Sequence, residues 1–232
     1  MFMTVKIKKA ALCGAAILAL LAAVLFSRQL SKPAMSGNTR TLVIDPGHGG
    51  IDGGAVAADG TKESAINLAV GLRMRAIAGL FGVDTVMTRE TEESGVSVSE
   101  YSEHGDLVRR AELTNSVPGA VLVSVHQNNF PTAQPSGAQV LYAASGGSRE
   151  LGLLAQSALV GFADPGNRRV AEPAPEKLLL TSSVGCPAIL AECGFMSNSG
   201  EAAKLKTPEY QTKLACALTA AYLQFAGGAS PA

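Results

Sequence analysis

Residues 41–54, TLVIDPGHGGIDGG, are the stretch on which both the fold and the site depend. The first five residues form a β-rich run, which leads into a turn where His48, one of three histidines in the chain, stands among glycines. Glycines leave open space around their neighbours because they carry no side chain. A metal ligand or a catalytic group needs such space and a buried packing residue does not; taken alone, His48 fits a plain turn histidine equally well.

The composition limits the number of domains and the kind of partner. The chain has 232 residues, 47% of them hydrophobic, which suffices for one sizeable core and favours one domain over two. Its net charge is zero, but residues 1–40 hold six Lys and Arg and no acids, so the remainder carries 13 basic against 19 acidic residues. An acidic domain argues against a nucleic-acid partner, because phosphate backbones are bound by clustered Lys and Arg.

The N-terminal segment predicts export. A lysine-rich head precedes an apolar run at residues 10–26, about the minimum length that crosses a bilayer. No clean Ala-x-Ala site follows, which favours an uncleaved signal anchor at residues 1–28 over a cleaved signal peptide; a buried core helix is the remaining alternative. The lysines should stay in the cytoplasm, so a linker at 29–40, a domain at 41–226 and a tail at 227–232 should lie outside the membrane, anchored or secreted.

After residue 40 the hydrophobic pattern alternates between strands and helices. This alternation is typical of βαβ units, so we expect a single α/β domain with a mainly parallel, twisted sheet and helices on both faces. The nearly continuous apolar runs at 120–125 and 187–191 fit strands buried on both faces. We expect strands at 41–45, 84–89, 120–128, 137–144, 187–195 and, more briefly, 177–181, helices at 63–82, 106–117, 148–163 and 207–226, and loops at 90–105 and 164–177.

Four polar residues from distant parts of the chain fall at one edge of such a sheet. His48 follows the first strand, Glu63 opens the next helix, and His126 and Glu192 end two apolar strands. Ligands of open α/β sheets bind at the edge where the strands end. Singly, Glu63 can be a charge favoured at a helix N-terminus and His126 a strand cap. Glu192 is harder to dismiss, because an unpaired carboxylate after four apolar residues is costly.

These residue types indicate zinc. Two neutral imidazoles and one carboxylate, with water in the fourth position, are a common catalytic zinc set, whereas Ca²⁺ and Mg²⁺ prefer oxygen ligands only. We therefore predict His48, Glu63 and His126 as ligands of one Zn²⁺. We predict that Glu192 takes a proton from the bound water and passes it on, because apolar surroundings raise the pKa of a carboxylate.

Other residues and motifs give weaker evidence of function. Asp45 can orient a ligand histidine or simply form the turn, and His104, in the acidic loop, should be solvated and without a role. Cys186, Cys193 and Cys216 make no disulfide framework; the first two can pair, but apolar packing is favoured. The glycine-rich turn lacks the spacing of a P-loop or a dinucleotide fingerprint, and no G-x-S-x-G elbow is present.

Six successive blocks carry a resemblance to a known family: VIDPGHGGIDGGA (43–55), KESAINLAV (62–70), MTR (87–89), LVRRAELTN (107–115), VLVSVHQNN (121–129) and ILAECGFMSNSGEAAKL (189–205). In this order they resemble the zinc-dependent N-acetylmuramoyl-L-alanine amidases of the AmiC and LytC catalytic type, from about Thr41 to Phe225. The resemblance implies hydrolysis of the amide between the lactyl group of N-acetylmuramic acid and L-alanine in peptidoglycan. It implies zinc ligation by His48, Glu63 and His126, and catalysis by Glu192.

The neighbours of these motif residues differ in part from the family pattern. Asn128 and Asn129, on the loop of His126, are candidates for hydrogen bonds to the peptide or sugar, with a plain turn role equally open. Relatives often have alanine at the position of Gln127 and an aliphatic residue at that of Cys193. We therefore expect altered substrate contacts near Gln127 and a cysteine close to the site.

The resemblance also bears on regulation and setting. Residues 144–185 leave little room for the long helical insertion that blocks the zinc in some relatives, so we expect no built-in autoinhibition. Wall-binding repeats are absent, so targeting to peptidoglycan has to come from the membrane segment or from a partner such as an activator protein. A short, anchored enzyme of this kind is similar to the germination-specific amidases of spore cortex. The rival readings are a zinc peptidase or deacetylase acting on the wall, and a protein that binds peptidoglycan without cutting it.

Overall fold

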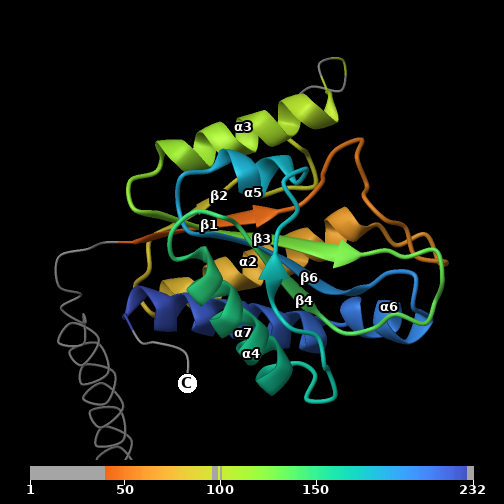
Figure 1. Cartoon of the computed structure of the whole chain (residues 1–232). Helices are drawn as coiled ribbons and strands as arrows, with labels where there is room; N and C mark the ends of the chain where they lie inside the picture. Colours follow the sequence, from red (N-terminus) through yellow and green to blue (C-terminus); the bar gives the residue numbers. More distant parts are fainter. Residues whose placement is uncertain (1–39, 96–98, 100, 229–232) are drawn as a thin grey trace, which may run out of the picture. The chain divides into compact units, whose positions relative to one another are not determined.

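The apolar run that begins the quoted stretch is strand β1 (Thr41–Pro46), which lies inside a sheet (Figure 1). The structure is a computed structural model that describes residues 40–95, 99 and 101–228. The predicted signal anchor, the linker up to residue 39 and most of the predicted tail lie outside the described residues. Within the described part of the chain, no helix is both long and apolar enough to cross a membrane.

The sheet of the described residues has six strands in the order β2-β1-β3-β6-β4-β5. Strands β2 (Thr85–Met87), β1, β3 (Ala120–Asn128) and β6 (Ala188–Phe195) run parallel to one another. Strand β4 (Gln139–Tyr142) is antiparallel to β6, and the short β5 (Glu172–Pro173) is parallel to β4. The expected mainly parallel sheet is confirmed, and its register brings the carboxyl ends of β1, β3 and β6 to one edge.

Helices cover both faces of this sheet (Figure 1). On one face lie α3 (Glu103–Ser116) and α5 (Leu179–Ser183), which contact each other. On the other face lie α2 (Glu63–Leu80), α4 (Ser148–Phe162) and α7 (Pro208–Ala226), with α7 packed against both of its neighbours. A further short helix, α6 (Ser199–Leu205), follows β6.

The continuous apolar strands are explained by burial on both faces. In β1, Leu42 and Ile44 belong to the core under α2 and α7, whereas Val43 between them belongs to the smaller core under α3 and α5. In β3, Val121 and Val123 face the larger core and Leu122 the smaller one. Alternate side chains of a strand point to opposite faces, so a strand in the middle layer needs apolar residues at every position.

Two expectations about elements are wrong, and two short elements were not expected. The stretch at 177–181 is not a strand: residues from Leu179 form the helix α5, whose Leu180 packs into the smaller core. Helix α3 begins at Glu103 and not at Asp106, because the hydroxyl of Ser102 accepts a hydrogen bond from the Gly105 amide and caps the first turn. The sequence pattern also gave no sign of β5 and α6.

Candidate functional site

The four predicted site residues lie at the carboxyl edge of the parallel strands. His48 follows β1, Glu63 is the first residue of α2, His126 lies near the end of β3, and Glu192 lies in β6. The register places His126 directly opposite Glu192 on neighbouring strands. Both strands run two or three residues beyond these positions, so the two side chains project from the sheet and not from its connecting loops.

Three of the four side chains form a cluster that can hold a metal ion. One ligand atom from each of His48, Glu63 and His126 lies within 4.8 Å of the others. Glu63 Oε1 is 3.3 Å from His48 Nε2 and 3.1 Å from His126 Nδ1, and the two imidazole rings meet edge to face with 4.9 Å between centroids. Two ligands at about 2 Å from one tetrahedral zinc ion are themselves roughly 3 Å apart, so these separations suit a shared ion.

The carboxylates and imidazoles in and beside the cluster stabilise one another's charged forms. Burial opposes ionisation of Glu63, but the two imidazoles outweigh burial and hold the pKa of its carboxyl well below its usual range. Burial lowers the pKa of His48, but the carboxylates of Glu63 and Asp52 outweigh burial and raise this pKa to about 9. A group of this kind exchanges its proton for a cation, because a metal ligand has to be deprotonated.

The glycines around His48 make room for the cluster. A Cβ atom at Gly47 would lie 2.2 Å from the ring of His126, and one at Gly54 would lie 2.6 Å from Glu63 Oε2 and 2.7 Å from the ring of His48. His48 itself has a positive φ of 62°, the only non-glycine residue among those described to do so. The open setting predicted from the sequence is therefore a requirement of the ligand side chains.

Asp52 orients His48, a role that the sequence reasoning considered for Asp45. The Nδ1 atom of His48 is 2.7 Å from Asp52 Oδ2, and Tyr101 donates a hydrogen bond to the same oxygen at 3.1 Å. The Gly54 amide donates to the other oxygen of Asp52. A carboxylate that accepts from the outer nitrogen of a ligand histidine fixes its ring and tautomer. The position of Asp52 four residues after His48 was the available signal.

The carboxylate of Glu63 is held by three donors outside the cluster. The amide of Ala55 donates to Oε2 at 2.9 Å, and the amide of Gln127 donates to Oε1 at 2.9 Å. Asn67, one turn further along α2, donates from Nδ2 to Oε1 at 3.1 Å. Glu63 is 3% exposed and its oxygens are turned to these partners, so it is more than a charge at a helix N-terminus.

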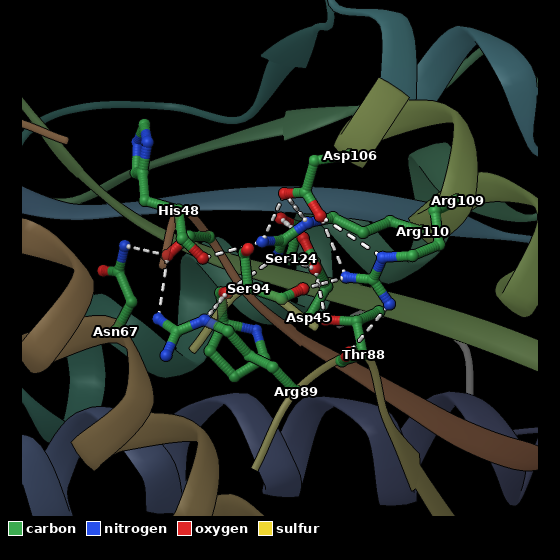
Figure 2. Close-up of polar contacts among 12 residues, drawn as sticks. Asp45, His48, Asn67, Thr88, Arg89, Ser94, Asp106, Arg109, Arg110 and Ser124 are labelled. Atoms are coloured by element: carbon green, nitrogen blue, oxygen red, sulfur yellow. Dashed lines mark hydrogen bonds and ion pairs between the residues drawn. The ribbon is translucent and has the colours of Figure 1, made fainter. Parts of the chain in front are cut away.

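Two buried arginines hold the backbone of the turn that carries His48 (Figure 2). Arg110 donates to the carbonyl oxygens of Pro46 and His48 at 2.9 and 2.7 Å. Arg89 donates to those of Pro46 and Gly47 at 2.9 and 3.0 Å. Figure 2 shows the His48 carbonyl facing the arginines while its ring points away from them. The two arginines thus hold the carbonyl groups of Pro46, Gly47 and His48 by hydrogen bonds. The imidazole of His48 is directed into the site.

Arg110 is in turn neutralised by two buried aspartates. Its guanidinium lies 2.7 Å from Asp45 Oδ1 and 2.7 Å from Asp106 Oδ2. Thr88 and Ser124 also donate to Asp45, each at 2.6 Å. Burial opposes ionisation of Asp45, but Arg110 and the two hydroxyls outweigh burial and hold its pKa at about 2. Asp45 is therefore a structural anion beneath the site, and both arginines are functional residues that the sequence reasoning missed.

Glu192 lines a cavity of about 290 Å³ together with His48 and His126. Its Oε2 atom is buried and has no hydrogen-bond partner among the described residues. Burial, with a smaller contribution from the Glu63 carboxylate, raises the pKa of Glu192 although His126 and His48 oppose the rise. A carboxyl group with a raised pKa and a free oxygen next to a cavity can accept and release a proton.

Part of the cavity wall comes from the α3 and α5 side of the sheet. Lys177, Leu178, Leu180 and Thr181 line the cavity from the segment before and within α5. Residues 144–185, which we expected to hold one crossover helix and a loop, contain α4, β5 and α5. In the described structure α5 borders the cavity and does not fill it.

The remaining candidates lie outside the cavity. Asn128 is half-buried at the end of β3 and Asn129 is exposed beyond it, so their substrate role stays a prediction. His104 is exposed, as expected.

The two departures from the family pattern are both buried. The side chain of Gln127 is 3% exposed and does not line the cavity, so it lies beneath the site and not, as expected, near the substrate. Cys193 is fully buried, next to Glu192 in the chain but in the larger core, and burial raises the pKa of its thiol. The cysteine thiols at 186, 193 and 216 are free.

Comparisons with known proteins agree with this geometry. The family model described as N-acetylmuramoyl-L-alanine amidase matches residues 42–223. The germination-specific N-acetylmuramoyl-L-alanine amidase of Bacillus subtilis is 32% identical over 197 residues, which are 80% of this chain and 79% of that protein. The N-acetylmuramoyl-L-alanine amidase AmiA of Escherichia coli is 30% identical over 63% of this chain, which spans only 45% of AmiA. Among solved structures, the CwlD amidase from Clostridioides difficile in complex with the GerS lipoprotein has a TM-score of 0.72 and 31% identity, covering 80% of this chain and 98% of that chain.

Proposed function

We propose that this chain, which belongs to the family of N-acetylmuramoyl-L-alanine amidases, hydrolyses the amide bond between the lactyl group of N-acetylmuramic acid and L-alanine in peptidoglycan. The observation that carries the proposal is the cluster of His48, Glu63 and His126, whose two histidines line one cavity together with Glu192. The described part of residues 41–226 is the catalytic domain.

The donor set fits a zinc ion. Two imidazoles and one carboxylate would hold a zinc ion and leave one of its four positions for water, as in catalytic zinc sites, and both histidines line the cavity. The absence of a side chain at Gly47 leaves room for the ring of His126, and Glu192, whose buried Oε2 has no partner among the described residues, supplies a proton acceptor in the same cavity. When bound, zinc supplies a water of lowered pKa and polarises the carbonyl under attack.

The side chains of the chain then have separate roles. Glu192 accepts a proton from the attacking water through its free oxygen and later donates this proton to the departing amine of L-alanine. Asp52 keeps the ring of His48 in one tautomer, and the donors around Glu63 keep its carboxylate turned toward the two imidazoles. Arg89 and Arg110 hold the His48 turn in place, so the ligands are positioned before substrate arrives.

Further proposals concern substrate contacts, location and partners, and they rest on the sequence pattern and on relatives. Asn128 and Asn129 contact the glycan or peptide beside the scissile bond. The catalytic domain acts outside the cytoplasmic membrane, where peptidoglycan lies, and the segment at 1–28 exports and anchors it. The similarity to a germination-specific amidase and to an amidase solved with a lipoprotein supports a spore cortex substrate and an activating partner.

Product analysis tests the function. Purified sacculi and spore cortex are digested with the full-length chain, with and without zinc and a chelator, and the products are identified by mass spectrometry. We expect intact stem peptides that begin with L-alanine, released only when zinc is present. Cleavage inside the stem peptide would indicate a peptidase, loss of acetyl groups a deacetylase, and bound zinc without any product a protein that binds the wall without cutting it.

A further inference from the structure

A relay of two buried amides lies behind the proposed metal ligand Glu63. Gln127 follows His126 in β3, and successive side chains of a strand point to opposite faces. The Nε2 atom of Gln127 donates to Asn67 Oδ1 at 3.1 Å. Asn67 in turn donates from Nδ2 to Glu63 Oε1 at 3.1 Å and to the Gly47 carbonyl at 3.2 Å. The relay therefore ends on a carboxylate of the cluster and on the turn before His48.

The chemistry of its end points fixes the direction of this relay. The carboxylate of Glu63 and the carbonyl of Gly47 can only accept hydrogen bonds, so Asn67 has to present its NH₂ group to them. The Oδ1 atom of Asn67 then faces Gln127. Because this oxygen can only accept a hydrogen bond, Gln127 has to donate one. Only the NH₂ group of Gln127 can serve, and its Oε1 atom points elsewhere.

This orientation is unfavourable for Gln127 itself. Its Oε1 atom is buried and accepts no well-formed hydrogen bond among the described residues, and beyond the relay the side chain has a weak contact with the thiol of Cys193. A buried unpaired oxygen costs stability, and an apolar side chain of the same length would avoid that cost. A buried amide whose oxygen is poorly satisfied while its NH₂ group joins an oriented relay to the site is best explained by the site.

We propose that Gln127 is a positioning residue for zinc binding, which rests on the metal site of the proposed function. Its side chain holds the amide of Asn67, and Asn67 holds the carboxylate of Glu63 toward the imidazoles of His48 and His126. The backbone amide of Gln127 also donates to Glu63, and this bond remains available when methionine replaces Gln127. Loss of the side chain should therefore weaken zinc binding by about tenfold, the lower end of the range for residues behind a metal ligand.

A double-mutant cycle on zinc affinity tests the relay. The dissociation constant of zinc is measured on the full-length chain by competition with a chelating indicator, for wild type, Gln127→Met, Asn67→Ala and the double variant. Gln211→Met is the matched control, since Gln211 is a buried glutamine of α7 whose amide donates to the Leu205 carbonyl. Urea unfolding of the metal-free proteins establishes that each variant is folded.

We expect Gln127→Met to weaken zinc binding about tenfold, to unfold at the same urea concentration as wild type or a higher one, and to recover its hydrolysis rate at saturating zinc. Asn67→Ala should weaken binding more, the double variant no more than Asn67→Ala, and Gln211→Met not at all. A zinc affinity of Gln127→Met within twofold of wild type would overturn the proposal. So would a full effect of Gln127→Met in the Asn67→Ala background, because the relay would then not pass through Asn67. A wild-type chain that binds no zinc would instead refute the metal site, and this proposal with it.

Discussion

Replacing Arg110 by methionine should destabilise the domain and loosen the site together. The guanidinium is 1% exposed and is shared between Asp45 and Asp106, and it donates to two carbonyls of the His48 turn. Removing one partner of a buried ion pair costs about 3–5 kcal/mol, because the other charge stays buried without compensation. The hydroxyls of Thr88 and Ser124 still donate to Asp45, so we expect the lower end, about 3 kcal/mol.

The assay is urea unfolding of the full-length, zinc-free chain at pH 7, followed by circular dichroism. Arg110→Met should lower the free energy of unfolding by about 3 kcal/mol without a change in slope. Arg75→Met is the control, because the ion pair of Arg75 with Glu90 is solvent-exposed and such pairs contribute about 0–1 kcal/mol. Zinc affinity should fall by about tenfold in Arg110→Met, because the His48 carbonyl loses its donor.

Two results would refute this reasoning. An unfolding free energy of Arg110→Met within 1 kcal/mol of wild type would mean that Asp45 and Asp106 do not depend on the guanidinium. A variant that is strongly destabilised but binds zinc as tightly as wild type would mean that the arginine stabilises the fold without positioning His48.

Three further predictions concern individual residues. Because Asp45 has its pKa lowered from 3.8 to about 2, its contribution of about 2 kcal/mol should be complete above pH 4 and lost as the pH falls toward 2; Asp45→Asn should flatten this part of the acid unfolding curve. Gly47→Ala would place a Cβ 2.2 Å from the ring of His126, so hydrolysis should fall about 100-fold, whereas Gly146→Ala, where nothing lies within 4 Å, should leave it unchanged; equal rates in both variants would contradict the packing argument. Glu192→Gln should still bind zinc by competition titration but lose about 10²- to 10⁴-fold in turnover, and a wild-type rate would remove Glu192 from the proton transfer.

The parallel part of the fold was predictable because its strands repeat one physical requirement. Strands β1, β3 and β6 are buried on both faces, so they read as unbroken apolar runs. Parallel strands end at one edge, and the sequence order alone placed His48, His126 and Glu192 there. Short elements have too few residues to show a hydrophobic pattern. Helix α5 has five residues, and its apolar residues are as compatible with a strand as with one turn of helix.

The support of the ligands could not be read from the sequence. Arg89 and Arg110 look like surface charges on a strand end and a helix, and only the fold brings them under the carbonyls of the His48 turn. Asp45 and Asp52 both lie near His48 in sequence, and either could have oriented its ring. The choice between them depends on the positive φ of His48, which turns the imidazole toward Asp52 and away from the strand.

The most direct measurement of the central claim is anomalous diffraction at the zinc absorption edge from crystals of the zinc-loaded chain. We predict a single peak bonded to His48, Glu63 and His126 at about 2.0–2.2 Å, with Glu192 within hydrogen-bond reach of a water in the fourth position. A peak held by other side chains, or zinc bound without one of these three ligands, would contradict the account.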